Sequence, residues 1–216
     1  MKKFLIPLLF VLAAAANLAG QLLQNDPLAS TSKILLMPLL IIWVLSRRLP
    51  ERHLSFLLPL ALVFSWLGDI FLIFDHLFIA GLASFLVTQI LYSVIFYQSV
   101  KGQLHQPFLR MIPYIFYGAA FFYVILPEAG NLKVAIIVYG VSLLSMGFLS
   151  LTRQGNSSTI SFVLVVAGST FFIFSDSLIA AGMFLNKLPN HSFWVMSGYT
   201  AAQLLIVSGL ISDQST

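Results

Sequence analysis

The sequence of 216 residues contains no cysteine and few charged side chains. The lack of cysteine excludes disulfide bonds, thiolate nucleophiles and cysteine-ligated metals. Charged residues make up 8% of the chain, whereas an ordinary soluble domain has about 25%. So few charges cannot cover a water-facing surface. The 11 lysines and arginines are also too few to form the basic face of a nucleic-acid-binding protein, so no nucleic-acid partner is expected.

Apolar residues take the place of the missing charges: they form 59% of the chain and recur in long runs from Phe4 onward. A membrane-spanning helix needs roughly 20 apolar residues, so the chain has room for about eight spans and no separate soluble catalytic domain. The runs do not alternate as barrel strands would. We therefore expect an all-α, polytopic transmembrane helical bundle that forms a single domain over residues 1–216. The expected spans lie near residues 4–23, 31–47, 54–74, 77–100, 107–126, 131–152, 158–185 and 191–211.

The distribution of basic residues predicts the orientation of the spans. Eight of the 11 lysines and arginines fall on the side that holds the N-terminus and the loops after spans two, four and six. Basic loops stay in the cytoplasm, so both termini are expected to be cytoplasmic. The expected location is the bacterial cytoplasmic (inner) membrane. The eight residues are Lys2, Lys3, Arg47, Arg48, Arg52, Lys101, Arg110 and Arg153, and the opposite side has Lys33, Lys133 and Lys187.

The first span also permits a second interpretation. Lysines at positions 2 and 3, an apolar stretch and the alanines before Asn17 are typical of a cleavable signal peptide. The apolar stretch continues to Leu23, which is longer than the core of a typical signal peptide and favours a retained span.

Two acidic residues, Asp69 and Asp176, lie inside apolar runs. A carboxylate in hydrocarbon costs several kcal/mol, so such residues normally face a cavity and mark a functional site. Their expected depths differ by roughly 5 Å, and we expect the two to meet in one pocket in the outer half of the membrane. Two carboxyl groups in one apolar pocket share a proton and provide a general acid and a general base. A proton relay, a cation site or simple packing against neighbouring hydroxyl groups stays open.

Other polar residues within the spans are candidates for substrate binding or support. The binding candidates are Lys33, Gln89, Tyr92, Tyr199 and Gln203, and the supporting candidates are Ser65, Gly68 and Ser175. Lys33 opens span two, where it either reaches a lipid phosphate or extends to the interface. Serine and glutamine in spans more often hold helices together than act on a substrate. None of the four histidines has a partner at metal-ligand spacing, so neither a metal site nor a cofactor is expected.

A weak internal repeat is visible at an offset of four spans. Spans three and seven each contain one aspartate, and spans two and six open with Lys33 and Lys133. Parallel repeats of this kind occur in some transporters. The pattern keeps a transporter among the candidate functions.

Five stretches of the chain resemble the YhhN-like integral membrane family, which includes lysoplasmalogenases. They retain the order and the spacing of the family over most of the chain. Members often have histidine where this chain has Gln89, so no role that needs an ionisable group is carried over to that position. The stretches are residues 33–38, 65–69, 81–92, 174–178 and 199–206.

The resemblance implies an enzyme that hydrolyses the vinyl ether bond of lysoplasmalogens within the membrane. The products would be a fatty aldehyde and glycerophospho-ethanolamine or -choline, with Asp69 and Asp176 as the catalytic carboxyl groups. The implied partners are a lysophospholipid substrate and membrane lipids, and no oligomeric state is implied. A proton-coupled transporter that uses the two aspartates as a relay is the alternative, and a structural role in a membrane assembly is a third hypothesis.

Overall fold

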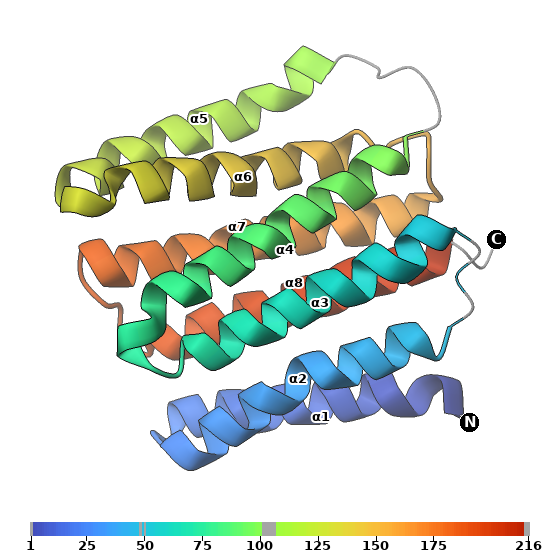
Figure 1. Cartoon of the computed structure of the whole chain (residues 1–216), viewed down its shortest axis with the longest axis horizontal. Coiled ribbons are helices and arrows are strands. Elements are labelled where there is room, and N and C mark those ends of the chain that lie inside the picture. The colour runs from blue at the N-terminus through green and yellow to red at the C-terminus, as the bar shows by residue number, and fades with distance from the viewer. Residues whose placement is uncertain (1, 48, 50, 101–106, 214–216) are drawn as a thin grey trace. The chain divides into compact units, whose positions relative to one another are not determined.

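The computed structural model describes residues 2–47, 49, 51–100 and 107–213, and all regular structure in these ranges is helical (Figure 1). Eight of the helices are long and apolar enough to cross a membrane. The prediction of an all-α, multi-pass membrane protein is therefore confirmed. The cytoplasmic location of both termini stays a prediction, and two of the basic residues on which it depends, Arg48 and Lys101, lie outside the described residues.

The chain divides into two compact units, residues 1–95 and residues 96–214. The first contains α1 (Lys2–Leu22), α2 (Asp26–Leu45), α3 (Arg52–Phe71) and most of α4 (Phe78–Gln98). The second contains α5 (Pro107–Ile125), α6 (Lys133–Leu151), α7 (Thr159–Phe184) and α8 (His191–Ser212). The predicted single domain over residues 1–216 stays a prediction.

In the first unit, α1 and α2 lie side by side because small and polar residues bring their backbones together (Figure 1). A Cβ atom at Gly20 would lie 2.7 Å from the backbone nitrogen of Ala29, so only glycine fits this approach. The amide of Asn17 donates a 2.7 Å hydrogen bond to the carbonyl of Ala29. The α2 helix begins at Asn25, whose side chain accepts a hydrogen bond from the backbone nitrogen of Leu28.

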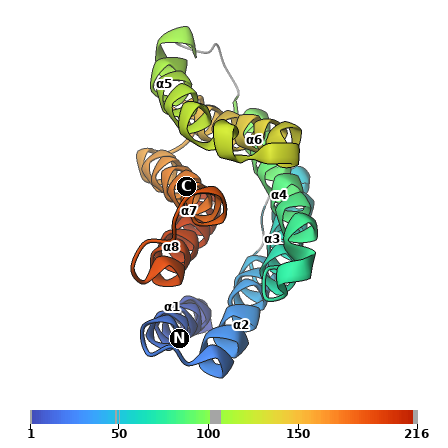
Figure 2. The same ribbon diagram turned by 90° about the vertical axis from the view of Figure 1, so that its left-hand side faces the viewer.

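The second unit is built around the close pair α7 and α8, which are seen nearly end-on in Figure 2. A Cβ atom at Gly168 of α7 would lie 2.7 Å from Ile206 and 2.9 Å from the carbonyl oxygen of Ala202 on α8. Small residues at a helix–helix contact allow close approach, which is how helices associate in a membrane. This packing fixes the face that α7 presents to α6.

The ends of α6, α7 and α8 are joined by a buried arginine. The Arg153 guanidinium donates to the Asp213 carboxylate at the end of α8 (3.1 Å) and to the Ser161 hydroxyl in the first turn of α7 (3.0 Å). The other carboxylate oxygen of Asp213 accepts from the backbone nitrogen of Ser158, the N-cap of α7. We call these four residues the end clamp.

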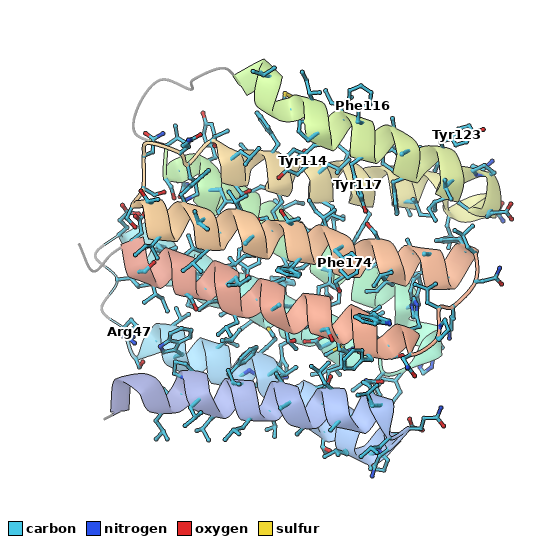
Figure 3. All side chains as sticks on the ribbon, turned by 180° about the vertical axis from the view of Figure 1, so that it is seen from behind. Arg47, Tyr114, Phe116, Tyr117, Tyr123 and Phe174 are labelled. Atoms are coloured by element: carbon cyan, nitrogen blue, oxygen red, sulfur yellow. The ribbon has the colours of Figure 1, made fainter. Side chains whose placement is uncertain are left out.

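The four labelled side chains of α5 point to two opposite sides of the helix (Figure 3). The side chains of Phe116 and Tyr123 are 73% and 84% exposed and point outward. Tyr114 points inward and packs on Gly147 of α6, and Tyr117 points toward α7. The outer side is suited to contact with lipid chains.

Candidate functional site

Asp69 lies on α3 in the first unit and has a cationic partner. Its side chain is 1% exposed, and its Oδ1 atom lies 3.7 Å from Nζ of Lys33 on α2. The separation is that of an ion pair and is too long for a direct hydrogen bond. The lysine stabilises the charged carboxylate by Coulomb attraction and repels a metal cation from it. Lys33, a candidate for binding a lipid phosphate, therefore lies next to a predicted catalytic carboxylate.

Residues one turn before Asp69 anchor α3 to its two neighbours. The Trp66 indole donates a 2.9 Å hydrogen bond to the carbonyl of Ile34 on α2. The Ser65 hydroxyl donates to the Thr88 hydroxyl on α4 at 3.2 Å. These contacts fix the rotation of α3 and hence the direction of Asp69. They also give the predicted supporting residue Ser65 a defined structural role.

The glycine before Asp69 permits close packing with α4. A Cβ atom at Gly68 would lie 2.7 Å from the ring of Phe85, so a larger residue would displace that ring. Farther along α4, Gln89 and Tyr92 are both fully buried. Their burial fits the prediction that this part of α4 faces the interior, and their role in substrate binding stays a prediction.

Asp176 lies on α7 in the second unit, within three consecutive polar residues that bond to three different helices. The Ser175 hydroxyl donates to the carbonyl of Val195 on α8 at 2.9 Å. The Tyr139 hydroxyl on α6 donates to Oδ2 of Asp176 at 2.5 Å. The Tyr117 hydroxyl on α5 donates to the Ser177 hydroxyl at 2.5 Å. Successive helical residues point about 100° apart, so the three side chains reach three neighbours.

The two binding candidates on α8 are buried in the second unit. Tyr199 is 3% exposed, and its ring packs edge-on against Phe172 of α7 with a centroid separation of 6.1 Å. Gln203 is fully buried one turn farther along. The residue before Tyr199, Gly198, approaches Ser175 so closely that a Cβ atom would lie 3.2 Å from the serine Cβ. These contacts place Tyr199 beside the helix that carries Asp176.

Sequence reasoning missed the tyrosines that bond to α7. Tyr139 is the residue that donates to Asp176, and nothing in its apolar surroundings in the sequence distinguishes it from a packing residue. The signal that was available is its hydroxyl group, because a buried tyrosine hydroxyl usually finds a partner. The expectation that Asp69 and Asp176 meet in one pocket stays a prediction, since the two residues belong to different units.

Among the described residues, each unit thus has one fully enclosed carboxyl group with a defined partner beside it. In a low-dielectric interior, such groups exchange protons or stabilise a positive charge far more strongly than they would in water. The fold and these residues define a class, that of multi-pass α-helical membrane proteins with buried acid groups. Within that class, the chain belongs to the YhhN family, whose pattern matches residues 28–210.

Curated relatives of this chain are named as lysoplasmalogenases. Lysoplasmalogenase TMEM86B of Homo sapiens is 30% identical over 165 residues, which cover 76% of this chain and 66% of the human protein. The Mus musculus protein of the same name is 30% identical over 158 residues, 73% of this chain and 65% of the relative. The chain therefore matches slightly less than two thirds of the length of these relatives. No solved structure is significantly similar to the chain.

Proposed function

We propose that this protein hydrolyses the vinyl ether bond of lysoplasmalogens and releases a fatty aldehyde and a glycerophospho-ethanolamine or -choline. The observation that carries the proposal is a pair of acid groups buried inside apolar helices in a chain similar to lysoplasmalogenases. A lipid substrate accounts for reactive groups within the membrane, where a water-soluble substrate would not reach them.

Vinyl ether hydrolysis requires groups of the kind that the chain contains. Protonation of the outer alkene carbon gives an oxocarbenium ion, and water then adds to the carbon bonded to oxygen. The reaction needs a proton donor, an anion that stabilises the cation, and a base for the attacking water. We assign these tasks to Asp69 and Asp176, which supply carboxyl groups without the help of a redox cofactor.

Substrate recognition is assigned to Lys33 and to four buried polar residues of α4 and α8. Lys33 is suited to the lipid phosphate as well as to Asp69, because its side chain is 14% exposed and retains some access to the surroundings. Gln89, Tyr92, Tyr199 and Gln203 offer hydrogen-bonding groups inside spans for the glycerol and ether oxygens.

The test is aldehyde release by the purified protein in detergent. Three lysolipids that differ only in the linkage at sn-1 (alkenyl ether, alkyl ether and ester) are supplied separately, with a chelator throughout. We expect aldehyde from the alkenyl lipid alone, at a rate that the chelator leaves unchanged. Fatty acid from the ester at a comparable rate would contradict the vinyl ether assignment.

The same preparation separates the enzyme from the transporter hypothesis. Buried carboxyl groups with hydroxyl donors are also the parts of a proton relay. If folded protein yields no aldehyde from any of the three lipids, reconstituted vesicles with a pH-sensitive dye inside will show whether the two aspartates conduct protons instead. Proton flux that Asp69→Asn and Asp176→Asn abolish would establish the transporter.

A further inference from the structure

An exposed hydrogen bond joins α5 to α7 within the second unit. The Tyr117 hydroxyl donates to the Ser177 hydroxyl at 2.5 Å, although the Tyr117 side chain is 42% exposed and points from α5 toward α7 (Figure 3). Both residues lie inside apolar spans, where polar side chains normally face the interior of the protein. Among the eight described spans, Met111–Glu128 has the lowest fraction of buried residues, 11%. The hydroxyl pair is therefore accessible to a lipid that approaches α5 from the side.

The protons of this hydroxyl pair are already in use. The Ser177 hydroxyl accepts the proton of Tyr117 and donates its own proton to the carbonyl of Ile173, four residues earlier on α7, at 2.7 Å. A tyrosine hydroxyl has one proton, and its oxygen also accepts hydrogen bonds. Tyr117 therefore presents to a ligand an oxygen that accepts a hydrogen bond and has no proton left to donate.

We propose that the Tyr117 oxygen accepts a hydrogen bond from the free sn-2 hydroxyl group of a lysolipid, an inference that rests on the function proposed above. An alcohol can donate this bond, whereas the oxygen of an sn-2 ester has no proton. The contact would therefore select lysolipids over lipids that are esterified at sn-2. Ser177 is the positioning residue: because it takes the proton of Tyr117, the lone pairs of the tyrosine stay available to the ligand.

The position of the hydroxyl pair fits the structure of a lysolipid. Ser177 follows Asp176 directly in the sequence, so the Cα atoms of the two residues are about 3.8 Å apart. In a lysolipid, the sn-2 hydroxyl group lies on the glycerol carbon next to the one that bears the ether oxygen. A lipid bound by Tyr117 would therefore have its ether linkage near Asp176. These three residues belong to one unit.

A second tyrosine of α5 provides the matched control, because hydrogen bonds between spans also simply hold helices together. Tyr114 hydrogen-bonds to Ser150 of α6 and to Thr170 of α7. Thr170 lies six residues before Asp176 (176 − 170), which corresponds to about 9 Å along the helix. The bond of Tyr114 thus joins the same two helices at a distance from Asp176.

The experiment measures the binding of three alkyl ether lysolipids, which lack the vinyl ether bond. They are identical except at sn-2, where they have a hydroxyl group, a methoxy group or hydrogen. Each displaces the radiolabelled hydroxyl ligand from purified protein in detergent. Dissociation constants are compared as ratios between ligands in wild type, Tyr117→Phe, Ser177→Ala and Tyr114→Phe, so that the partition of each ligand into detergent cancels.

For wild type and Tyr114→Phe, we expect the methoxy and hydrogen ligands to bind about 5–10-fold more weakly than the hydroxyl ligand, the effect of one neutral hydrogen bond. Tyr117→Phe should remove this preference by weakening the hydroxyl ligand alone. Ser177→Ala releases the Tyr117 proton, so the methoxy ligand should gain affinity relative to the hydrogen ligand. An unchanged preference in Tyr117→Phe would overturn the proposal. Equal loss of preference in Tyr114→Phe would overturn it as well, because the packing of α5 would then explain the effect.

Aldehyde release by the same preparations tests the proposed function separately. Wild-type protein that prefers the hydroxyl ligand but releases no aldehyde would contradict the proposed function and support the hydroxyl contact. Aldehyde release without a preference among the three ligands would overturn the contact alone. If Tyr117→Phe does not fold, Ser177→Ala decides, and no gain in affinity for the methoxy ligand would overturn the proposal.

Discussion

The surroundings of Asp69 and Asp176 differ in charge although their placement is similar. Each aspartate lies on the third helix of its unit and has a partner on the second: Lys33 of α2 for Asp69 and Tyr139 of α6 for Asp176. The two partners are separated by 36 residues in the first unit (69 − 33) and by 37 in the second (176 − 139). Equivalent positions thus provide a charge in one unit and a neutral hydroxyl group in the other.

The comparison also refines the internal repeat expected from the sequence. The weak repeat pairs Lys33 with Lys133, at the starts of spans two and six. The contact to Asp176 comes instead from Tyr139, which lies six residues after Lys133 on α6 (139 − 133). If the units share an ancestor, the position of the partner residue is the one that has diverged in charge. The repeat itself stays a prediction.

The largest effect should come from replacing either aspartate by asparagine. Asp69→Asn and Asp176→Asn are each expected to lower kcat for aldehyde release by about 10²–10⁴-fold, because asparagine cannot transfer a proton. Their stabilities should differ. In the Asp176→Asn variant the amide oxygen would still accept from Tyr139, whereas Asp69→Asn leaves Lys33 without the carboxylate charge and costs roughly 1–3 kcal/mol. Thermal unfolding in detergent measures the difference.

The matched control for these variants is Asp26→Asn. Asp26 is exposed in the first turn of α2, so its replacement should change neither turnover nor unfolding temperature appreciably. Equal stability losses for Asp69→Asn and Asp176→Asn would contradict the distinction between a charged and a neutral partner.

An intermediate effect is expected at the lysine. Lys33→Met removes the charge beside Asp69 and should lower kcat about 10-fold, equivalent to roughly 1.4 kcal/mol in transition-state stabilisation, with a smaller change in KM. Lys33→Arg retains the charge and should recover part of kcat. Lys133→Met, at an exposed position in the other unit, is the matched control. A rise in KM larger than the fall in kcat would instead favour the phosphate contact predicted from the sequence.

The smallest effects concern the serines near the two aspartates. Ser65→Ala removes the hydrogen bond to Thr88, and Ser175→Ala removes the one to the Val195 carbonyl. Hydrogen bonds between membrane helices contribute about 0.6 kcal/mol on average, so each variant should unfold slightly earlier with kcat within 3-fold of wild type. Ser145→Ala, which removes a bond within α6 only, should have no measurable effect on unfolding. A 10-fold loss of kcat at either serine would indicate a direct role in catalysis.

The fold was predictable because the length of an apolar run determines whether it spans a membrane. The burial of Asp69 and Asp176 was predictable for the same reason, since both lie inside such runs. Their partners were not. The period of one helix gives the face on which a residue lies, but the meeting of Asp176 with Tyr139 also depends on the crossing angle and relative shift of α6 and α7, which a single sequence does not specify.

The end clamp sets an order of events during biosynthesis. Arg153 leaves the ribosome 60 residues before Asp213, its partner at the end of α8. At typical rates of synthesis that interval lasts roughly 3–12 s, during which α6 and α7 can enter the membrane while the carboxylate of Asp213 does not yet exist. Arg153 is fully buried in the finished clamp. Because Asp213 follows α8 in the sequence, the arginine can pair with it only after the last helix has been synthesised. Insertion of α8 therefore completes the second unit, and a nascent chain that stalls before it would keep an exposed guanidinium group as a mark of incomplete assembly.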